Sequence, residues 1–491
     1  MTDDVMAQNE GESAGGGLEV NLERGLPSTL PAGTTCVPLI VGTCICPEAP
    51  DGVPEIGVNG HFRPVENGRM PRLGIGDANY RSGFWTNLEI EAGPAGESNQ
   101  VEFRVKRPDG SSITTGVSQI RSVDSAGGPG QEASPARVAI AMATYNPDPV
   151  LFTRQIESIR EQSEPDWTCL ISDDCSDAES RSFIESAIEG DDRFHFSPSP
   201  ERLGFYRNFE RALGMVPAGV GFIALCDQDD SWHPDKLETL IASIGDASLI
   251  YSDQRLVDRD GNLISETFWV GRRNNFTDYR SMLVANTVTG AASMFRADLL
   301  DLLLPFPDPP GWQFHDQWIA AAAMATGDLA YVDRPLYDYV QHPGAILGQV
   351  SGEETSPGVV SRLKERTAEW RSFSTGWRAA YFYDYLRIQN QAELILFRGG
   401  ARVRKDRHKV LKWFAEADDG WSAALRLLLR PVRGLFGRNE TLGVEAQLAR
   451  GLIWRRLVEV RSDRVKPPLR GGEPDAGLPV VAPTEYGSQR L

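Results

Sequence analysis

Three aspartates follow directly on an apolar stretch in the segment ALCDQDDSWHPDKL, residues 224–237. Asp227, Asp229 and Asp230 would repel one another at the end of a buried strand unless a cation compensates their charge. A divalent ion with oxygen ligands, bound together with a diphosphate, provides this compensation. Alternate residues of an extended segment share a side, so Asp227 and Asp229 can face one ligand. The segment predicts a metal–diphosphate site; an acidic turn before a helix that begins near His233 is the structural alternative.

A further aspartate, Asp316, lies in the aromatic segment GWQFHDQW, residues 311–318. A carboxylate in this setting can take a proton from an acceptor hydroxyl group. Asp316 can also cap a helix that begins near Gln317, and the two roles are compatible. Farther along the chain, His342 is a candidate third metal ligand beside Asp229. A histidine at the surface is the alternative for His342.

Three other segments place polar or aromatic side chains next to expected strand ends. Tyr145, in ATYN, can stack on a flat base, and Asp174, in ISDD, can accept a hydrogen bond from the imide N–H of uracil or thymine. Arg202 and Arg207 can contact a diphosphate, and Asn208 can position a nucleotide or cap a helix. The alternatives are a tyrosine packed at a strand end, a helix-capping aspartate and solvated arginines on a helix. Taken together, these residue types favour a nucleotide site.

An alternation of apolar runs and helical patterns must position these residues. The expected buried strands lie at 138–143, 168–174, 194–199 and 221–226. The expected helices lie between them, at 150–163, 181–190 and 207–216. This order predicts an α/β domain with a doubly wound sheet and right-handed crossovers. Ligands of such sheets bind at the carboxyl ends of the strands, where the candidate residues fall.

The flanking regions differ in texture from the centre. Residues 18–124 show short β-like runs between Pro- and Gly-rich turns, which predict an antiparallel β-sandwich. Residues 351–470 show helical spacing with many basic residues, and we expect an α-helical region there. The remaining segments are expected to be a disordered start, a linker and a loose tail, at 1–17, 125–135 and 471–491.

Composition narrows the function classes. The 491-residue chain has a net charge of −18; residues 1–134 carry −9 and residues 351–491 carry +8, which leaves −17 for residues 135–350. An acidic centre argues against nucleic-acid binding and suits a site that gathers a divalent cation, although a solvated acidic surface has the same charge. No apolar run is long enough to span a membrane, and the acidic N-terminus does not predict a signal peptide.

The six cysteines are sparse and give no metal motif. Cys44 and Cys46 have one residue between them, without a second pair or a nearby histidine, which argues against zinc. We expect reduced thiols, as in the cytoplasm.

Over about 210 residues, from Arg137 to Gly348, these segments in this order resemble an inverting family 2 glycosyltransferase of the GT-A fold. The segment DQDDSWHPDKL is most similar to the rhamnosyltransferase-like branch. The resemblance implies a GT-A domain over residues 136–350, a Mn²⁺ or Mg²⁺ cofactor, and a nucleotide-sugar donor, either dTDP-rhamnose or a UDP-sugar. It further implies a glycan or lipid-linked acceptor in bacterial cell-surface polysaccharide or cell-wall synthesis.

The resemblance assigns roles to individual residues. On the donor side it places Ala143, Tyr145, Asp174, Arg202, Asn208, Asp227 and Gln228. On the side of the acceptor and the donor sugar it places Thr289, Gly290, Trp312, His315 and Trp318. Asp229 and His342 are the expected metal ligands, and Asp316 is the expected catalytic base. The residue before this base is usually Glu in the family and is His315 here.

Several alternatives remain open. A noncatalytic glycan-binding or scaffold protein would have lost the acids that are present here, and a phosphatase using Asp227 would need Lys and Thr motifs that are not found. The N-terminal region is expected to bind glycan, to assemble oligomers or only to pack. The basic Leu/Arg helix near 422–438 either lies on an anionic membrane surface, which would place a cytoplasmic enzyme on the inner face of the membrane, or packs on the acidic core.

Overall fold

The computed structural model describes residues 17–22, 26–33, 35–36, 38–65, 67–70, 82–123, 136–269, 274–307, 314–341, 376–429, 441 and 443–460. The predicted linker and tail, and residues 1–16 of the predicted disordered start, lie outside these ranges. The chain divides into two compact units, the first ending at Asp124 and the second beginning at Ser125.

The first unit is built of short strands. Its strands are β1 (Glu19–Leu22), β2 (Thr29–Pro31), β3 (Thr35–Cys36), β4 (Leu39–Ile45), β5 (Pro54–Val58), β6 (His61–Pro64), β7 (Asn67–Met70), β8 (Gly83–Asn87), β9 (Ile90–Glu91), β10 (Ser98–Lys106) and β11 (Ser112–Val123). Among the described residues they form two sheets of order β1-β4-β8-β7 and β2-β11-β10-β5-β6, and the pair β3-β9. All pairs are antiparallel except β2 with β11.

Buried and more exposed residues alternate along β10, and a buried side chain contacts the other sheet. Val101, Phe103 and Val105 are buried, while the residues between them are more exposed. The ring of Phe103 lies 4.9 Å from that of Phe84, which belongs to the other sheet. This contact is of the kind that a β-sandwich core contains. The assignment of the unit as a β-sandwich stays a prediction.

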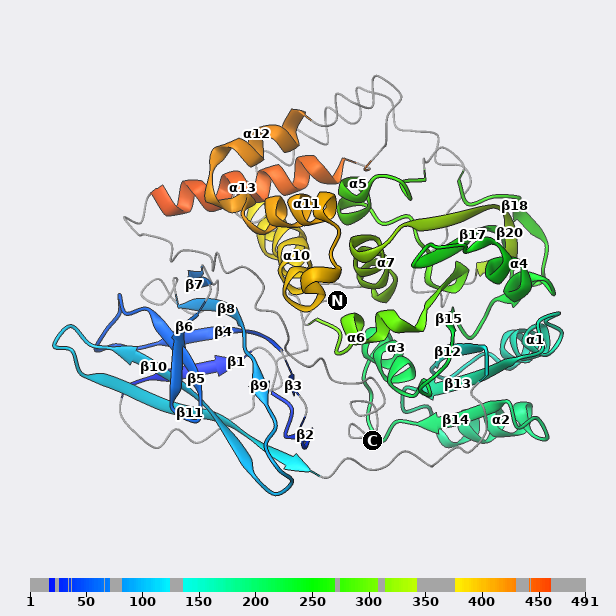
Figure 1. Ribbon diagram of the computed structural model, residues 1–491, viewed down its shortest axis with the longest axis horizontal. Helices are drawn as coiled ribbons and strands as arrows, with labels where there is room; N and C mark the ends of the chain where they lie inside the picture. Colours follow the sequence, from blue (N-terminus) through cyan, green and yellow to red (C-terminus); the bar gives the residue numbers. More distant parts are fainter. Residues whose placement is uncertain are drawn as a thin grey trace. The chain divides into compact units, whose positions relative to one another are not determined.

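The second unit contains a mixed sheet. Its strands are β12 (Val138–Thr144), β13 (Trp167–Asp173), β14 (Phe194–Pro198), β15 (Phe222–Cys226), β16 (Ser231–Trp232), β17 (Leu249–Asp258), β18 (Leu263–Ser265), β19 (Ser293–Arg296) and β20 (Leu329–Gln341). Within the described residues the order is β14-β13-β12-β15-β19-β17-β20-β16, and β18 pairs with β17. Figure 1 shows these strands at the centre of the unit, with helices on either side.

The predicted parallel sheet is found in the first half of the unit. Strands β14, β13, β12 and β15 are parallel neighbours. They are joined by α1 (Pro149–Arg160), α2 (Ala178–Ile188) and α3 (Phe205–Gly214). The helix starts follow the sequence closely, since the Asp148 side chain accepts hydrogen bonds from the N–H groups of Val150 and Leu151, and Pro149 occupies the first turn. The central α/β domain is therefore confirmed.

The second half of the sheet departs from a purely parallel arrangement. Strand β19 inserts between β15 and β17 and runs antiparallel to both, whereas β17 and β20 are parallel. The helices of this half are α4 (Lys236–Ser243), α5 (Tyr279–Val284), α6 (Leu300–Leu303) and α7 (His315–Thr326). Two short 3₁₀ turns, η2 (Gly290–Ala292) and η3 (Ala297–Leu299), flank β19. The connection from β17 to β19 contains β18, α5 and η2.

Helices follow the sheet in the C-terminal part. They are α9 (Gly376–Ala379), the π-helical η4 (Ala380–Tyr385), α10 (Leu386–Gly399), η5 (Gly400–Arg402), α11 (Lys405–Ala415), η6 (Ala417–Asp419), α12 (Trp421–Leu429) and α13 (Val444–Val460). Helix α10 contacts α7, and α11 contacts both α7 and α5 (Figure 1). Among the described helices none has the length and apolar character needed to cross a membrane.

Candidate functional site

The carboxyl ends of β12, β13 and β15 meet at one edge of the sheet. The strands are in register, with Thr144 opposite Asp173 and Met142 opposite Cys226. Each strand is followed by candidate residues: Tyr145 after β12, Asp174 after β13 and Asp227 after β15. Neighbouring parallel strands therefore bring segments far apart in the sequence to a single edge, as predicted.

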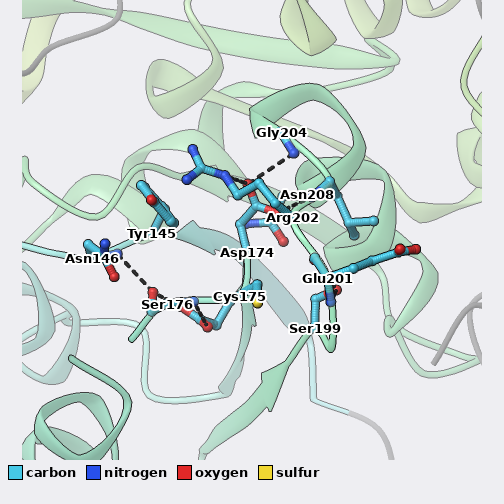
Figure 2. A network of polar contacts seen from close by, with 12 residues as sticks. Tyr145, Asn146, Asp174, Cys175, Ser176, Ser199, Glu201, Arg202, Gly204 and Asn208 are labelled. Carbon is cyan, nitrogen blue, oxygen red and sulfur yellow. Dashed lines mark hydrogen bonds and ion pairs between the residues drawn. The ribbon is translucent and has the colours of Figure 1, made fainter. Parts of the chain in front are cut away.

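Tyr145, Asp174 and Arg202 form one contact group at this edge (Figure 2). The guanidinium carbon of Arg202 lies 3.1 Å from the centroid of the Tyr145 ring. The Nε of Arg202 donates to Oδ2 of Asp174 at 2.7 Å. The Asp174 carboxylate also accepts from the backbone N–H groups of Leu203 and Gly204. Asp174 is almost completely buried, whereas Tyr145 is exposed.

The buried neighbour of Asp174, Asp173, holds the turn that carries this group. Its carboxylate accepts from Thr144 Oγ1 at 3.1 Å, from Ser176 N–H at 2.9 Å and from the Ser176 hydroxyl. Cys175 in the turn and Asn146 after β12 both have positive φ, 59° and 37°. Such backbone is costly for residues other than glycine, and hydrogen bonds such as those of Asp173 hold it in place. The sequence singled out Asp174 and did not reveal this structural role of Asp173.

The buried side chain of Asn208 forms hydrogen bonds with the ends of β12 and β13. Its Nδ2 donates to the carbonyl groups of Ser172 at 2.8 Å and Thr144 at 3.2 Å, and its Oδ1 accepts from the Ser172 hydroxyl at 2.6 Å. The residue is buried, and the N-cap of α3 is Gly204. The predicted nucleotide contact and helix cap are therefore corrected: the Asn208 amide is used within the protein and ties α3 to β12 and β13.

The two arginines of the same segment differ in their surroundings. Arg202 lies at the edge beside Tyr145, as described above. Arg207 pairs with Glu210 and donates to the carbonyl of Phe306 at 3.0 Å. Both of these contacts belong to the packing of α3, so the structure gives Arg207 a structural role instead of the predicted diphosphate contact.

The amide of Gln228 is directed at the backbone of Tyr145. Its Oε1 accepts from the Tyr145 N–H at 2.8 Å, and its Nε2 donates to the Tyr145 carbonyl at 3.2 Å. These two hydrogen bonds link the residues that follow β12 and β15. Gln228 was predicted on the donor side; here it positions the residue that carries the aromatic ring.

The aspartates after β15 form an acidic cluster. Burial and the charges of Asp229 and Asp316 raise the pKa of Asp227 to about 7. Asp230 is fully buried; one oxygen accepts from the Val340 N–H at 3.2 Å, and burial and its acidic neighbours hold its pKa well above the usual range. The cluster therefore has the unfavourable self-repulsion expected of a cation site.

Lys236 is a buried cation beside this cluster that sequence reasoning missed. Its ammonium group donates to the carbonyl of Ala291 in η2 and lies 3.6 Å from the centroid of the Trp232 ring. Burial lowers its pKa to about 7, while the nearby Cys226, Asp230 and Asp227 act in the opposite direction. Lys236 and its neighbour Leu237 both lie on the buried side of α4. A buried lysine needs acidic partners, so the adjacent acids in the sequence were the signal that could have pointed to it.

Asp316 lies in the first turn of α7, close enough to Asp227 to raise the pKa of that carboxyl. Helix α7 begins at His315, so Asp316 is not its N-cap; the N-cap is Phe314. The structure thus brings the predicted base and the predicted metal acids to one place, although they are about ninety residues apart in sequence.

His315 and Gly290 pack directly on each other beside Asp316. A Cβ atom added to Gly290 would lie 2.5 Å from His315 Nε2, so a larger residue does not fit there without movement. The His315 ring stacks on Phe209 with 3.7 Å between centroids. Burial lowers its pKa to about 3, and in the described part of the chain neither ring nitrogen has a hydrogen-bond partner. His315 is therefore a neutral imidazole at physiological pH.

The remaining predicted residues divide into three cases. Ala143 lies in β12 opposite Ser172, and Thr289 precedes η2 at its N-cap, so both adjoin the site. Trp318 is fully buried and donates to the carbonyl of Leu303 at 3.0 Å, which corrects its predicted place on the acceptor side. Trp312 and His342 lie outside the described residues. Within those residues no group of three or more His, Cys, Asp or Glu side chains is arranged to hold a metal.

Known proteins are similar to the part of the chain that carries these residues. Residues 139–303 match the sequence model of Glycosyl transferase family 2. The Bacillus subtilis glycosyltransferase TuaG, whose name refers to teichuronic acid biosynthesis, is 28% identical over 145 residues, 28% of this chain and 54% of that protein. The Campylobacter jejuni GalNAc(5)-diNAcBac-PP-undecaprenol beta-1,3-glucosyltransferase is 25% identical over 167 residues, 34% of this chain and 53% of that protein. The matches thus span about half the length of these two relatives.

Among solved structures, S. aureus TarS 1-349 in complex with UDP-GlcNAc is 15% identical, with a TM-score of 0.38, and the comparison covers 69% of this chain and 98% of that one. The matched family segment begins in β12 and ends in α6, and so contains the strand ends, the acidic cluster and η2. The central α/β region of the chain therefore contains the segment that matches glycosyl transferase family 2.

Proposed function

We propose that the chain transfers a sugar, with inversion, from a nucleoside-diphosphate donor to a hydroxyl group of a glycan or lipid-linked acceptor. Three observations support this most directly: Tyr145 and Asp174 both contact Arg202, acids follow β15, and the charge of Asp316 raises the pKa of Asp227. They correspond to the three parts that such a transfer needs: a site for the nucleobase, a site for the diphosphate and a general base that accepts a proton.

The proposed site for the nucleobase consists of Tyr145, Asp174 and Arg202. A flat base can stack on the exposed ring of Tyr145, beside or in place of the Arg202 guanidinium that now lies over it. The Asp174 carboxylate has acceptor capacity for an imide N–H. Uracil and thymine share this imide, so the proposal covers both UDP-sugars and dTDP-sugars, including dTDP-rhamnose.

The residues after β15 fit a divalent cation such as Mn²⁺ or Mg²⁺. Asp227 and Asp229 offer hard oxygen ligands, and a bound cation would offset the burial and the acidic neighbours that together raise the pKa of Asp227. Asp229, with His342 through the family resemblance, would hold the ion. When bound, it would supply positive charge to the leaving diphosphate.

Asp316 is proposed to act as general base. Its carboxylate would take the proton of the acceptor hydroxyl group, whose oxygen then attacks the anomeric carbon from the face opposite the leaving diphosphate. A single displacement of this kind inverts the configuration. His315, neutral and stacked on Phe209, fixes the start of α7 beside this carboxylate.

For the acceptor and the pathway we propose only a general class, bacterial polysaccharide synthesis. The names of the two relatives refer to teichuronic acid and to an undecaprenol-linked glycan, and we extend the common theme, bacterial polysaccharide synthesis, to this chain as a hypothesis. A thermal-shift screen of UDP- and dTDP-sugars with Mn²⁺ would identify the donor.

Replacement of Asp316 by Asn tests the proposal. The identified donor should bind to the variant within about twofold of the wild type, while transfer and donor hydrolysis fall by at least about 10³-fold. Asp333→Asn, at an exposed site in β20, is the matched control and should leave both unchanged. Turnover of the Asp316 variant near the wild-type rate would refute the assignment of the base. Absence of donor hydrolysis by the wild type with every donor that binds would favour a noncatalytic scaffold.

A further inference from the structure

Helix α12 (Trp421–Leu429) presents large apolar side chains to the outside. Of the eleven large apolar side chains that are exposed among the described residues, four lie in these nine residues: Trp421, Leu425, Leu428 and Leu429. Leu425 and Leu429 are 59% and 58% exposed. Most of the other exposed apolar residues are isolated in sequence, as is usual for soluble proteins.

The four side chains share one face of the helix. At about 100° per residue, positions 421, 425, 428 and 429 fall within an arc of about 100°. The opposite side of α12 is buried through small or single apolar residues, Ala423, Ala424 and Leu427, against the C-terminal helices. The side of the helix with mostly small apolar side chains therefore packs within the protein, whereas the side with the large apolar side chains faces outward. Packing against the described residues of this unit leaves the outward face exposed.

The charge of the same segment indicates what covers this face. Residues 421–438 contain four arginines and no acidic residue, in a chain whose net charge is −18. Arg426 is exposed beside the apolar face, and Arg430, Arg433 and Arg438 follow in the sequence. An apolar face of Trp and Leu beside an exposed arginine, in a segment whose sequence has further arginines and no acids, is typical of helices that lie in the headgroup region of anionic bilayers. The core of a protein–protein interface, by contrast, is depleted of charge.

We propose that α12, which we call the docking helix, binds the surface of an anionic lipid bilayer, with Trp421, Leu425, Leu428 and Leu429 inserted at the headgroup boundary and Arg426 on the phosphates. The helix is nine residues long and lies on the surface; it does not span it. Each arginine near an anionic surface adds to the attraction, and the apolar face adds the burial of hydrocarbon. This inference does not depend on the transfer reaction.

Flotation of the full-length protein with vesicles tests the docking helix. The wild type should float with phosphatidylglycerol–phosphatidylcholine vesicles, and little with phosphatidylcholine alone. The double variant Leu425→Glu/Leu429→Glu should lower the bound fraction by at least about tenfold. The triple variant Arg426→Gln/Arg430→Gln/Arg433→Gln should lower binding to anionic vesicles by a similar factor and reduce its dependence on salt.

A matched control separates this face from general surface hydrophobicity. Leu263→Glu/Ile264→Glu changes the exposed apolar pair of β18 and should leave flotation unchanged. Thermal unfolding of each variant near the wild-type temperature shows that the fold is intact, and the arginine variant adds a second, conservative test. Lack of flotation by the wild type, or equal losses in the control, would overturn the proposal. So would a wild-type dimer in size-exclusion chromatography that the Leu425/Leu429 variant converts to a monomer, because a second copy would then cover the face.

Discussion

The side-chain amide of Gln228 is paired on both sides with the peptide group of Tyr145, accepting from its N–H at 2.8 Å and donating to its carbonyl at 3.2 Å. The residue between two aspartates of the acidic cluster is therefore used to hold the aromatic residue of the neighbouring strand. This relationship joins the proposed base site to the proposed diphosphate site through one side chain.

Replacement of Gln228 by Met keeps the volume and removes both hydrogen bonds. Because each such bond contributes about 1 kcal/mol, the donor KM or Kd should rise by about tenfold, while kcat changes by less than about threefold. Steady-state kinetics and direct donor titration measure the two effects. If kcat falls and donor affinity stays constant, Gln228 acts on the reacting groups instead of positioning Tyr145.

Gly290 and His315 should be energetically coupled. Gly290→Ala places a Cβ atom 2.5 Å from His315 Nε2, and the ring cannot retreat easily because it stacks on Phe209. Overpacking of this kind costs about 1–3 kcal/mol of unfolding free energy.

A double-mutant cycle in urea measures this coupling. The combination of Gly290→Ala with His315→Ala should be less destabilising than the sum of the single changes, by at least about 0.5 kcal/mol. Additive effects would show that the close contact does not limit residue size at position 290.

Lys236 should act as an internal counter-charge for the acidic cluster. Lys236→Met removes a buried cation near Asp227 and Asp230, and we expect a loss of about 2–4 kcal/mol of stability. If the acids also bind a divalent ion, Mn²⁺ should restore part of this loss, so the rise in Tm on adding Mn²⁺ should be larger in the variant than in the wild type.

The exposed Lys405 provides the control for this experiment. Lys405→Met in α11 should change neither stability nor the response to Mn²⁺. An equal rise in Tm for wild type and Lys236→Met would contradict the compensation of the cluster by Lys236.

Asp338 should contribute stability that depends on pH. Its carboxylate accepts from Arg255 at 2.7 and 2.8 Å and contacts His233 at 3.0 Å. Despite its burial, the hydrogen bonds of His233 and Arg255 lower its pKa to about 2, below the usual 3.8. A lowered pKa in the folded state stabilises the protein above pH 4, and this contribution disappears as the pH falls from about 4 to about 2.

Asp338→Asn should therefore cost about 1–2 kcal/mol of unfolding free energy near pH 7 and progressively less below pH 4. A difference of about two pKa units sets an upper limit near 2.5 kcal/mol, which the remaining contact with solvent reduces. Urea unfolding at several pH values measures the difference, with the exposed Asp246→Asn as reference. A constant difference between pH 7 and pH 2.5 would contradict the ionic origin of the contribution.

Much of the catalytic region follows from local sequence. Apolar runs and helical spacing predicted β12 to β15 and α1 to α3. That the acids after β15 mark the site of chemistry stays a prediction. These features depend on periodicity and on chain order, which neighbouring residues determine. The match to the family model, too, lies within one continuous segment, residues 139–303.

Only the tertiary structure decided how individual polar side chains are used. Asn208 and Gln228 carry amides that suit a ligand equally well in sequence, yet both bind backbone groups that come from distant strands. Trp318 falls within the aromatic segment but faces the core, and Lys236 resembles a surface residue but is buried among acids. A hydrogen bond requires a partner within about 3 Å, and whether one is present depends on which strands the fold makes neighbours. The sequence by itself determined the elements and the residue types at their ends. The packing of β12, β13, β15 and α3 determined which of those polar side chains bind other groups of the protein.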